Sequence, residues 1–139
     1  IHEEIIEEHD IHREWCRLTP QTAEQINRTK LSDGRVVAVG TTSVRVLETA
    51  ARRGLGQSPN YTCPWQTVAP FEGFTDLYIT PGFEFRAVDA LITNFHLPKS
   101  TLLALVMAFA GEENIRHAYE AAIAQRYRFY SLGDAMLIL

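Results

Sequence analysis

A strand, a glycine-led loop and a helix follow one another without interruption in this sequence. Residues 36–39 (VVAV) form a run of β-branched and small side chains, which predicts a strand buried on both faces, as in a parallel sheet. The loop 40–43 (GTTS) follows at once. Apolar residues then recur at helical spacing, namely Val44, Leu47 and Ala51. Such a strand–loop–helix unit is the building block of α/β folds, so we expect this fold class.

The chain has 139 residues, which fits a single α/β domain over 1–139 whose layered sheet carries helices on both faces. The other expected elements are a strand within 11–18, helices over 20–30, 102–110 and 112–125, a strand over 76–79, an extended stretch over 83–93, and strands over 127–130 and 135–139. The helix 102–110 is apolar all round and needs cover on most sides. An acidic stretch over 1–10 precedes the first strand. Because Ile1 opens the sequence, we expect a missing upstream region before the segment 1–18.

Composition and charge exclude several classes of protein. Thirteen Lys and Arg against 17 Asp and Glu give a formal charge of −4, which excludes a wholly basic nucleic-acid binder but allows a local basic face. The longest apolar run, 102–110, is far shorter than the roughly 20 residues of a membrane span, so we expect no membrane association. No secretion signal opens the chain, and Cys16 and Cys63 form no disulfide framework. We therefore expect a cytoplasmic protein.

The loop 40–43 is the first candidate binding site. Its backbone N–H groups open a helix, where they can face an anion or a polar ligand, and its side chains are Thr41, Thr42 and Ser43. Arg45 lies in the first helical turn and can reach the same point. An ordinary hydroxyl N-cap explains the same residues, so both interpretations stay open. The loop is neither a Walker loop nor a dinucleotide fingerprint.

A histidine follows the second buried strand that we expect. His96, in the loop NFHLP at 94–98, can act as an acid, a base or a hydrogen-bond donor near neutral pH. Asn94 begins the same loop. Ser100 and Thr101 then open the apolar helix and supply a second helix N-terminus. The alternative is a loop histidine without a catalytic role.

The stretch 127–134 (YRFYSLGD) interleaves a cation with aromatic rings. Tyr127 and Arg128 suit stacking on a base and contact with a phosphate, and Gly133 and Asp134 belong to the turn that follows. The alternative is an aromatic edge strand whose rings belong to the core. Asp89 is a separate candidate, because it interrupts an apolar strand and a buried carboxylate needs a partner. Its role, structural or catalytic, stays open.

Histidines near the start of the chain indicate a metal site only weakly. The spacing of His2, His9 and His12 fits no common zinc pattern, and no cysteine pair assists them. We therefore expect solvated side chains and no bound metal. His12 and Glu14 would share one face of the first strand, and they remain weaker site candidates, as does Asp89.

The candidate loops are expected to meet. In open α/β sheets, ligands bind beyond the carboxyl ends of parallel strands. If the strands near 36–39 and 87–93 are parallel, the loops 40–43 and 94–96 line one crevice. The strand expected over 127–130 can bring its own loop to the same place.

Six blocks of the sequence, taken in order, resemble one enzyme family. They are EHDIHRE at 8–14, VVAVGTTSVRVL at 36–47, PGF at 81–83, VDALITNFHLPKSTL at 88–102, AFAG at 108–111 and YRFYSLGDAM at 127–136. Over nearly its whole length, the chain thereby resembles the S-adenosylmethionine:tRNA ribosyltransferase-isomerases of queuosine biosynthesis. A series of blocks in fixed order is far more specific than any single loop.

The resemblance implies transfer and isomerisation of the ribosyl moiety of S-adenosylmethionine onto 7-aminomethyl-7-deazaguanine in tRNA. The product would be epoxyqueuosine, and adenine and methionine would leave. S-adenosylmethionine would be consumed as a ribosyl donor, with no permanently bound cofactor. The proposed chemistry begins with loss of a proton next to the sulfonium, which requires a base. His96 is the first candidate for this base and Asp134 is the second.

The same resemblance implies roles for the loops. Residues 40–43 and Arg45 would hold the donor or a tRNA phosphate, whereas Tyr127 and Arg128 would contact tRNA. Family members are more than twice as long and insert a β-barrel domain, so this chain would be the C-terminal portion of their α/β domain without the barrel. We expect a monomeric parent protein and an inactive isolated fragment. The apolar helix 102–110 also makes self-association of the fragment an expectation.

Two other classes of function stay open. A small-molecule hydrolase or transferase would need a nucleophile beside His96, and Ser100 is the nearby choice, although no G-x-S-x-G elbow supports it. A non-catalytic α/β module would instead bind a partner through exposed core surface. Basic side chains discriminate between these functions: clustering would favour tRNA binding, and scatter would favour the alternatives. The residues concerned are Arg28, Lys30, Arg35, Arg116, Arg126 and Arg128.

Overall fold

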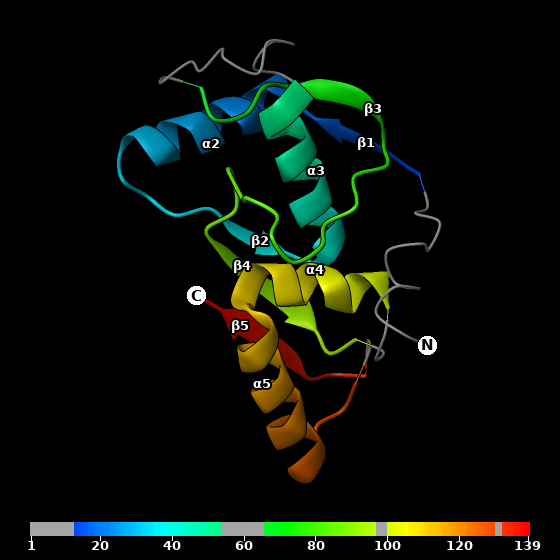
Figure 1. Ribbon diagram of the computed structural model, residues 1–139. Helices are drawn as coiled ribbons and strands as arrows, with labels where there is room; N and C mark the ends of the chain where they lie inside the picture. Colours follow the sequence, from blue (N-terminus) through cyan, green and yellow to red (C-terminus); the bar gives the residue numbers. More distant parts are fainter. Residues whose placement is uncertain (1–12, 54–65, 97–99, 130–131) are drawn as a thin grey trace.

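The computed structural model describes residues 13–53, 66–96, 100–129 and 132–139, and Figure 1 shows their arrangement. The elements follow the order β1 (Glu14–Leu18), α2 (Pro20–Leu31), β2 (Val37–Val39), α3 (Thr41–Arg53), β3 (Phe71–Thr75), β4 (Ala90–Asn94), α4 (Thr101–Ala110), α5 (Glu112–Ala124) and β5 (Ala135–Ile138). The expected α/β class is confirmed. The acidic stretch 1–10 lies outside the described residues.

Two small sheets organise the described part of the chain. The three-stranded sheet has the order β2-β4-β5, with β2 parallel to β4 and β5 antiparallel to β4. The second sheet pairs β1 with β3 in antiparallel fashion, and α3 contacts strands of both sheets. The parallel relation of β2 and β4, on which the expected crevice depends, is therefore confirmed.

Local sequence signals explain where the helices begin and end. Thr19 caps α2 through its hydroxyl oxygen, which accepts the backbone N–H of Thr22 at 3.2 Å, and Pro20 takes the first helical position. Ser100 caps α4 in the same way, with a backbone N–H 3.1 Å from its oxygen. Gly111 has a φ of 93° and separates α4 from α5, a conformation that residues with a Cβ rarely adopt. The helices expected over 20–30, 102–110 and 112–125 are confirmed.

The three-stranded sheet is buried on one face. Ala38 and Leu91 are almost fully buried and pack with side chains of α3, α4 and α5. The opposite face carries Val37, Val39 and Leu137, which are 47%, 66% and 59% exposed. The prediction that the strand near 36–39 is buried on both faces is therefore wrong. Alternate side chains point to opposite faces, and within the described residues the helices that pack on this sheet cover one of them.

The prediction of a strand over 76–79 is also wrong. The strand in this region, β3, ends at Thr75, whose buried hydroxyl lies 2.7 Å from that of Thr49 on α3. The chain then leaves the sheet, and Ile79 enters the core. The extended stretch expected over 83–93 likewise becomes a strand only where β4 begins. Both differences arise because pairing with a neighbouring strand, rather than local composition, decides where a strand forms.

Residues 127–129 are irregular, so a strand over 127–130 is not found in the described part of that stretch. Arg126 adopts a φ of 61°, and the N–H of Tyr127 donates to a carbonyl of α5 at 2.9 Å, which closes the helix end. Phe129 then stacks on Phe95 with ring centroids 5.2 Å apart. For Phe129, the alternative of a ring that packs on the core is therefore the better description, whereas Tyr127 stays 46% exposed.

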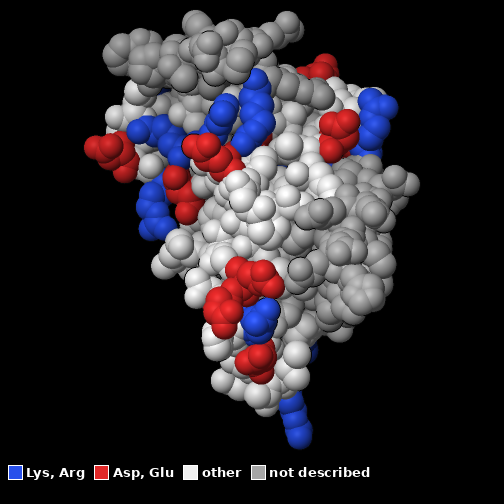
Figure 2. Space-filling model, viewed as in Figure 1, with Lys and Arg blue, Asp and Glu red and all other residues white. Residues whose placement is uncertain are grey.

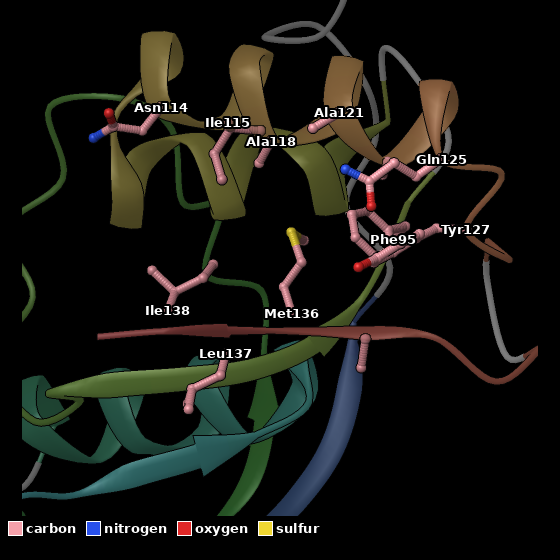
Figure 3. Close-up of a pocket in the computed structure, with 12 residues that line it drawn as sticks. Phe95, Asn114, Ile115, Ala118, Ala121, Gln125, Tyr127, Met136, Leu137 and Ile138 are labelled. Carbon is pink, nitrogen blue, oxygen red and sulfur yellow. The ribbon is translucent and has the colours of Figure 1, made fainter.

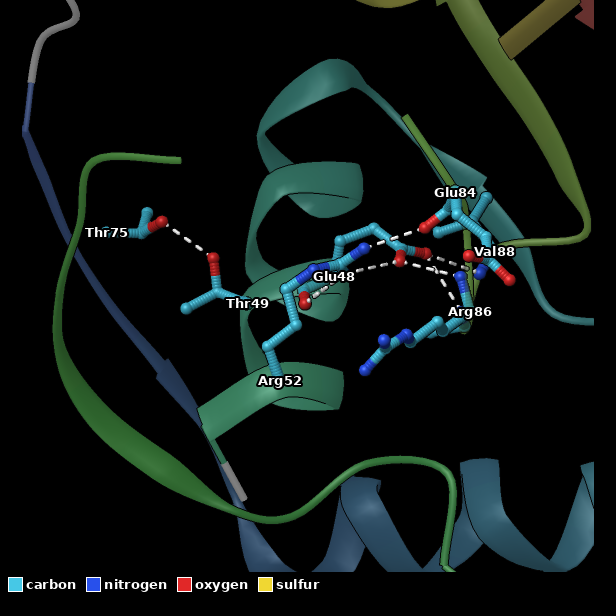
Figure 4. A network of polar contacts seen from close by, with 8 residues as sticks. Glu48, Thr49, Arg52, Thr75, Glu84, Arg86 and Val88 are labelled. Atoms are coloured by element: carbon cyan, nitrogen blue, oxygen red, sulfur yellow. Dashed lines mark hydrogen bonds and ion pairs between the residues drawn. The ribbon is translucent and has the colours of Figure 1, made fainter. Parts of the chain in front are cut away.

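A buried carboxylate joins α3 to the segment that leads into β4 (Figure 4). Glu48 is 0% exposed, and its carboxylate oxygens accept the backbone N–H groups of Arg86, Ala87 and Val88 at 2.8–3.0 Å. The guanidinium of Arg52, one helical turn later, donates to the same carboxylate at 3.0 Å. These donors replace the water that a carboxylate otherwise requires. The contact fixes how the chain approaches β4.

We predict that Glu48→Ala lowers the free energy of unfolding by about 3 kcal/mol, because buried N–H groups lose an anionic acceptor. Urea denaturation followed by circular dichroism measures this loss. Glu24→Ala is the matched control, since Glu24 pairs with Arg28 at i,i+4 on the exposed side of α2. Its removal should cost about 0.5 kcal/mol or less. Equal losses in the two variants would contradict the anchoring role of Glu48.

Candidate functional site

Three polar segments meet at one edge of the three-stranded sheet. Residues 40–43, which are Gly40 and the first residues of α3, follow β2, and the loop that begins beyond Asn94 follows β4, its parallel neighbour. The N–H of Gly40 donates to the carbonyl of Ile92 at 2.8 Å and ties the first loop to β4. Because β5 is antiparallel to β4, its first residue Ala135 pairs with Asn94. The turn before β5 therefore supplies the third loop at this edge.

His96 lies at this edge in a partly buried position. Its ring Nε2 is 2.8 Å from the hydroxyl oxygen of Thr93, and its backbone N–H donates to the hydroxyl of Tyr119 at 2.7 Å. Burial lowers the pKa of His96 below its ordinary value. Burial also raises the pKa of Tyr119, against the opposing effect of the hydrogen bond from the His96 backbone. The imidazole is therefore neutral at pH 7, which is the form that can accept a proton.

The two residues that hold His96 were not among the sequence candidates. Thr93 is 4% exposed and directs its hydroxyl to the imidazole, while Tyr119 reaches from α5 to a backbone group 23 positions earlier. A signal existed for Thr93, because a hydroxyl in a buried strand needs a polar partner. The helical spacing of Tyr119 with Ile115 and Ala122 is that of an apolar stripe, and Tyr119 does pack in the core, so nothing local indicates its hydrogen bond.

Aromatic rings support the loop of His96. Phe95 contacts Tyr119, Tyr127 and Phe129, with ring centroids 5.3, 5.9 and 5.2 Å apart. Such edge-to-face and stacked pairs bury apolar area and fix the orientation of the rings. Phe95 is buried, whereas Tyr127 stays 46% exposed. The ring of Tyr127 is therefore both part of the cluster and accessible at the surface.

A pocket of about 380 Å³ opens between α5 and β5, beside this aromatic cluster (Figure 3). Phe95 and Tyr127 line its end nearest the His96 loop, and Met136 and Ile138 line it from β5. Figure 3 shows the amide of Gln125 pointing towards the rings of Phe95 and Tyr127. The pocket and the sheet edge thus share their aromatic wall.

The turn before β5 places Asp134 against Arg128. The Oδ2 atom of Asp134 accepts the backbone N–H of Arg128 at 2.5 Å and lies 3.5 Å from the guanidinium Nε. Gly133 has a φ of 129°, and a Cβ at this position would lie 2.9 Å from the same guanidinium. Glycine therefore allows the turn and the close approach of Arg128. Asp134, the second candidate base, is already an acceptor in this arrangement.

The loop after β2 presents its hydroxyls unequally. Thr41 is 9% exposed, and the Oγ of Ser43 donates to the carbonyl of Val39 at 2.9 Å. Thr42 is exposed. Gly40 has a φ of 93°, which lets the chain turn directly from β2 into α3. Of the three hydroxyl residues, Thr42 is the most exposed to solvent.

Arg45 and Glu14, two separate sequence candidates, form an ion pair. Nη1 of Arg45 lies 3.1 Å from Oε2 of Glu14, and its Nε donates to the carbonyl of Leu77 at 3.1 Å. These contacts direct the guanidinium towards β1 and hold α3 against that strand. His12, which was expected to share a face with Glu14, lies outside the described residues.

Asp89 joins α2 to the three-stranded sheet. Its Oδ2 accepts a hydrogen bond from the Nζ of Lys30 at 2.7 Å and another from the backbone N–H of Val36 at 2.8 Å. Burial raises the pKa of the Asp89 carboxyl, but these hydrogen bonds and the charges of Lys30 and Arg35 outweigh it and leave the pKa below its usual value. Of the two roles left open by the sequence, these contacts favour the structural one.

The remaining candidates border the loop after β4. Asn94 is exposed at the end of the strand, and Thr101 is half-buried in the first turn of α4. The hydroxyl oxygen of Ser100 accepts an N–H group of its own helix, as an N-cap does. This contact gives no support to Ser100 as the nucleophile of a hydrolase.

The basic side chains of the described residues are scattered. Arg28 and Lys30 lie on α2, and Arg116 lies on α5 at the opposite end of the molecule. Figure 2 shows Lys and Arg interspersed with Asp and Glu on the face in view. Arg28 and Arg116 both pair with acids of their own helices. Arg28 and Lys30 therefore do not cluster with Arg116, as tRNA binding by itself would favour.

Within the described ranges, no group of three or more His, Cys, Asp or Glu side chains gathers to hold a metal ion. No helix in the same ranges is long and apolar enough to cross a bilayer. The functional groups that the sheet edge does present are an imidazole, a carboxylate, a guanidinium and hydroxyls.

The fold and this edge define an α/β protein whose polar loops gather beyond the carboxyl ends of parallel strands, where such proteins bind ligands. A profile of the queuosine biosynthesis protein family matches residues 1–138, and the chain belongs to this family. It is 57% identical over 135 residues to the S-adenosylmethionine:tRNA ribosyltransferase-isomerase of Ralstonia pickettii, covering 97% of this chain and 34% of that protein. The protein of the same name from Thermoanaerobacter is 49% identical over 139 residues, covering 100% of this chain and 38% of the relative.

A solved structure agrees with these relatives. The crystal structure of S-adenosylmethionine tRNA ribosyltransferase from Thermotoga maritima is 50% identical and superposes with a TM-score of 0.77, covering 90% of this chain and 40% of that one. The family expected from the sequence blocks is thus confirmed. The chain spans somewhat more than a third of the length of the relatives it matches.

We predict that Gly133→Ala lowers the free energy of unfolding by about 2 kcal/mol, because alanine is strained at this φ and its Cβ would displace the guanidinium of Arg128. Gly82→Ala is the matched control, since Gly82 has a φ of 99° but open space around its Cβ direction. It should cost about 1 kcal/mol from strain alone. Urea denaturation compares the two variants, and an equal cost would show that the Arg128 contact contributes nothing.

Proposed function

We propose that this chain, within its full-length protein, transfers and isomerises the ribosyl moiety of S-adenosylmethionine onto 7-aminomethyl-7-deazaguanine in tRNA, giving epoxyqueuosine. The names of its close relatives support the reaction class. The observation that carries the proposal is the neutral, partly buried imidazole of His96, held beside Thr93 at the ligand-binding edge of the sheet.

His96 is the proposed general base. The positive sulfonium acidifies the carbon next to it, and the imidazole accepts the proton that this carbon loses. The hydroxyl of Thr93 can donate to Nε2 or accept from it. In the tautomer in which Nε2–H donates to this hydroxyl, the lone pair on Nδ1 is the basic site. In the overall reaction the amine of the deazaguanine gains the ribosyl group, while methionine and adenine leave.

Asp134 is the second candidate for the base. It lies in the turn that the β4–β5 pairing brings to the same edge, but its Oδ2 already accepts the N–H of Arg128. In this proposal Asp134 therefore orients Arg128, and the proton transfer belongs to His96. The guanidinium of Arg128 is exposed and can contact a phosphate.

The other candidates form the walls of the proposed site. The N-terminus of α3 holds the donor or a tRNA phosphate through Thr41, Thr42 and Ser43, and Arg45 holds this helix end against β1. The loop after β4 contributes binding contacts from Asn94, Ser100 and Thr101. The turn near β5 contacts tRNA through Tyr127, Arg128 and Gly133.

Several properties of the whole protein belong to the same proposal. S-adenosylmethionine is a consumed co-substrate, no cofactor is permanently bound, and tRNA is the macromolecular partner. The enzyme acts as a monomer in the cytoplasm, where its tRNA substrate is found. The chain 1–139 forms one α/β unit, and because the relatives are far longer, the isolated unit is inactive.

We predict that His96→Ala in the full-length protein lowers kcat for adenine release by about 10²–10⁴-fold, because the base is lost. The assay uses tRNA carrying 7-aminomethyl-7-deazaguanine and S-adenosylmethionine, with epoxyqueuosine detected by mass spectrometry. His117→Ala is the matched control, since His117 is exposed on α5. Full activity of a folded His96→Ala variant would remove His96 from the mechanism. Absence of product from the folded wild type would overturn the proposed reaction itself.

The acid limb of the kcat/KM profile should lie below the ordinary histidine pKa of 6.5, because burial lowers the pKa of His96. Activity should rise with pH through this limb, since protonated imidazole cannot accept a proton. Thr93→Val removes the hydroxyl that holds the His96 imidazole by a hydrogen bond and should lower kcat by about tenfold while KM stays nearly constant. An acid limb above 6.5, or one that persists in His96→Ala, would contradict this assignment.

A further inference from the structure

The outward side of the β1–β3 sheet carries exposed side chains that the proposed active site does not use. Strand alternation buries Cys16, Leu18 and Thr75 against α3 and turns their neighbours outward. We call these outward residues the outer face, and they are Arg13, Trp15, Arg17, Glu72 and Phe74. In Figure 1 the two strands lie beside α3, away from α4 and α5.

Two large aromatic rings dominate the outer face. Trp15 and Phe74 lie directly opposite each other across the strand pair and are 56% and 48% exposed. Rings that pack into a core lose most of their exposure, as Phe95 does at 3%. An exposed cross-strand pair of rings therefore indicates a surface that receives a partner.

Guanidinium groups flank the rings. The Cζ of Arg13 lies 4.9 Å from the centre of the Phe74 ring, and the strand register places Arg17 opposite Glu72. Among the described residues neither arginine forms an ion pair, in contrast to Arg116, which pairs with acids of its own helix. Two arginines against one glutamate leave the face positive, which complements an anionic partner.

We propose that the outer face binds unpaired nucleotides of the substrate tRNA, with Trp15 and Phe74 stacking on bases and Arg13 and Arg17 contacting phosphates. This inference rests on the proposed function, which supplies tRNA as the partner. Aromatic platforms edged by cations bind single-stranded nucleic acid because every base has a π face. Paired stems hide these faces inside the helix, so the face selects loop nucleotides.

The outer face is joined to the candidate active site through one helix end. Glu14, the neighbour of Trp15, pairs with Arg45 in the first turn of α3. That turn begins with the loop 40–43, which borders the His96 edge of the sheet. The strand pair therefore separates nucleotides bound on the outer face from α3, and the Glu14–Arg45 ion pair joins β1 to the helix end that forms the wall of the site.

The test measures binding of a fluorescein-labelled anticodon stem–loop RNA to the full-length protein by fluorescence anisotropy. Trp15→Ala and Phe74→Ala should each raise Kd about fivefold or more, and Trp15→Phe should restore most of the affinity because it keeps a ring. Leu31→Ala is the matched control, since Leu31 is 54% exposed on α2, and it should leave Kd unchanged. A fully paired RNA duplex with the same number of nucleotides should bind more weakly and should not respond to Trp15→Ala.

Charge variants test the phosphate contacts separately. Arg13→Gln and Arg17→Gln should weaken binding and lower the slope of log Kd against log salt by roughly 0.7 each. Arg116→Gln, on α5, should change neither quantity. Circular dichroism and urea denaturation confirm that each variant is folded before it is compared.

Several outcomes would overturn the inference. Unchanged affinity of folded Trp15→Ala, or equal affinity for paired and unpaired RNA, excludes a stacking surface. Protection of Trp15 from acrylamide quenching in the RNA-free protein would mean that the rest of the full-length chain covers the face. If Trp15→Ala abolishes self-association but leaves RNA binding intact, the outer face is a contact between copies of the chain and not an RNA-binding surface.

The adenine-release assay distinguishes failure of this inference from failure of the proposed function. If wild type and Trp15→Ala release adenine with the same kcat and the same KM for tRNA, the outer face is not a tRNA surface and the proposed reaction stands. If wild type releases no adenine but binds the stem–loop in a Trp15-dependent manner, the surface stands and the proposed reaction fails.

Discussion

The carboxylate of Glu48 is the contact on which the arrangement of this molecule depends. It accepts successive backbone N–H groups of Arg86, Ala87 and Val88 in a place that water does not reach, and Arg52 balances its charge. The segment that carries these N–H groups cannot take another position, because its displacement would leave a buried anion without hydrogen-bond donors. The segment leads directly into β4, the central strand of the sheet. One side chain of α3 thereby positions the strand that leads to His96.

The candidate site is assembled from elements that are distant in sequence. β4 supplies Thr93, the loop after it supplies His96, and α5 supplies Tyr119, whose hydroxyl accepts the backbone N–H of His96. The antiparallel pairing of β5 with β4 returns Asp134 to the same edge. In the apolar surroundings of Phe95, a hydrogen bond such as that from His96 to Tyr119 is stronger than the same hydrogen bond in water. Tyr119 and the rings around Phe95 therefore hold the backbone of the His96 loop, while Thr93 contacts the imidazole and burial lowers its pKa.

The sequence predicted the features that depend on neighbours along the chain. Caps at Thr19 and Ser100 and the break at Gly111 marked helix ends that the structure confirms, because N–H groups at a helix start need local acceptors. Strands were predicted less well. β3 forms where it pairs with β1, and its composition does not distinguish it from the residues 76–79 that follow. The exposure of Val37 and Val39 depends on what covers the sheet, which their own pattern does not specify.

The sequence by itself determined the α/β class, the helices, the family and the loops that carry His96, Asp134 and Thr42. Each of these follows from local periodicity or from blocks in fixed order. Only the tertiary structure decided that Glu14 pairs with Arg45, that Asp89 binds Lys30, and that Trp15 faces outward beside Phe74. These contacts join residues 31 and 59 positions apart, or strands whose pairing sets their faces. The packing of whole helices and strands decides which residues meet at such separations, and a local sequence pattern does not specify these contacts.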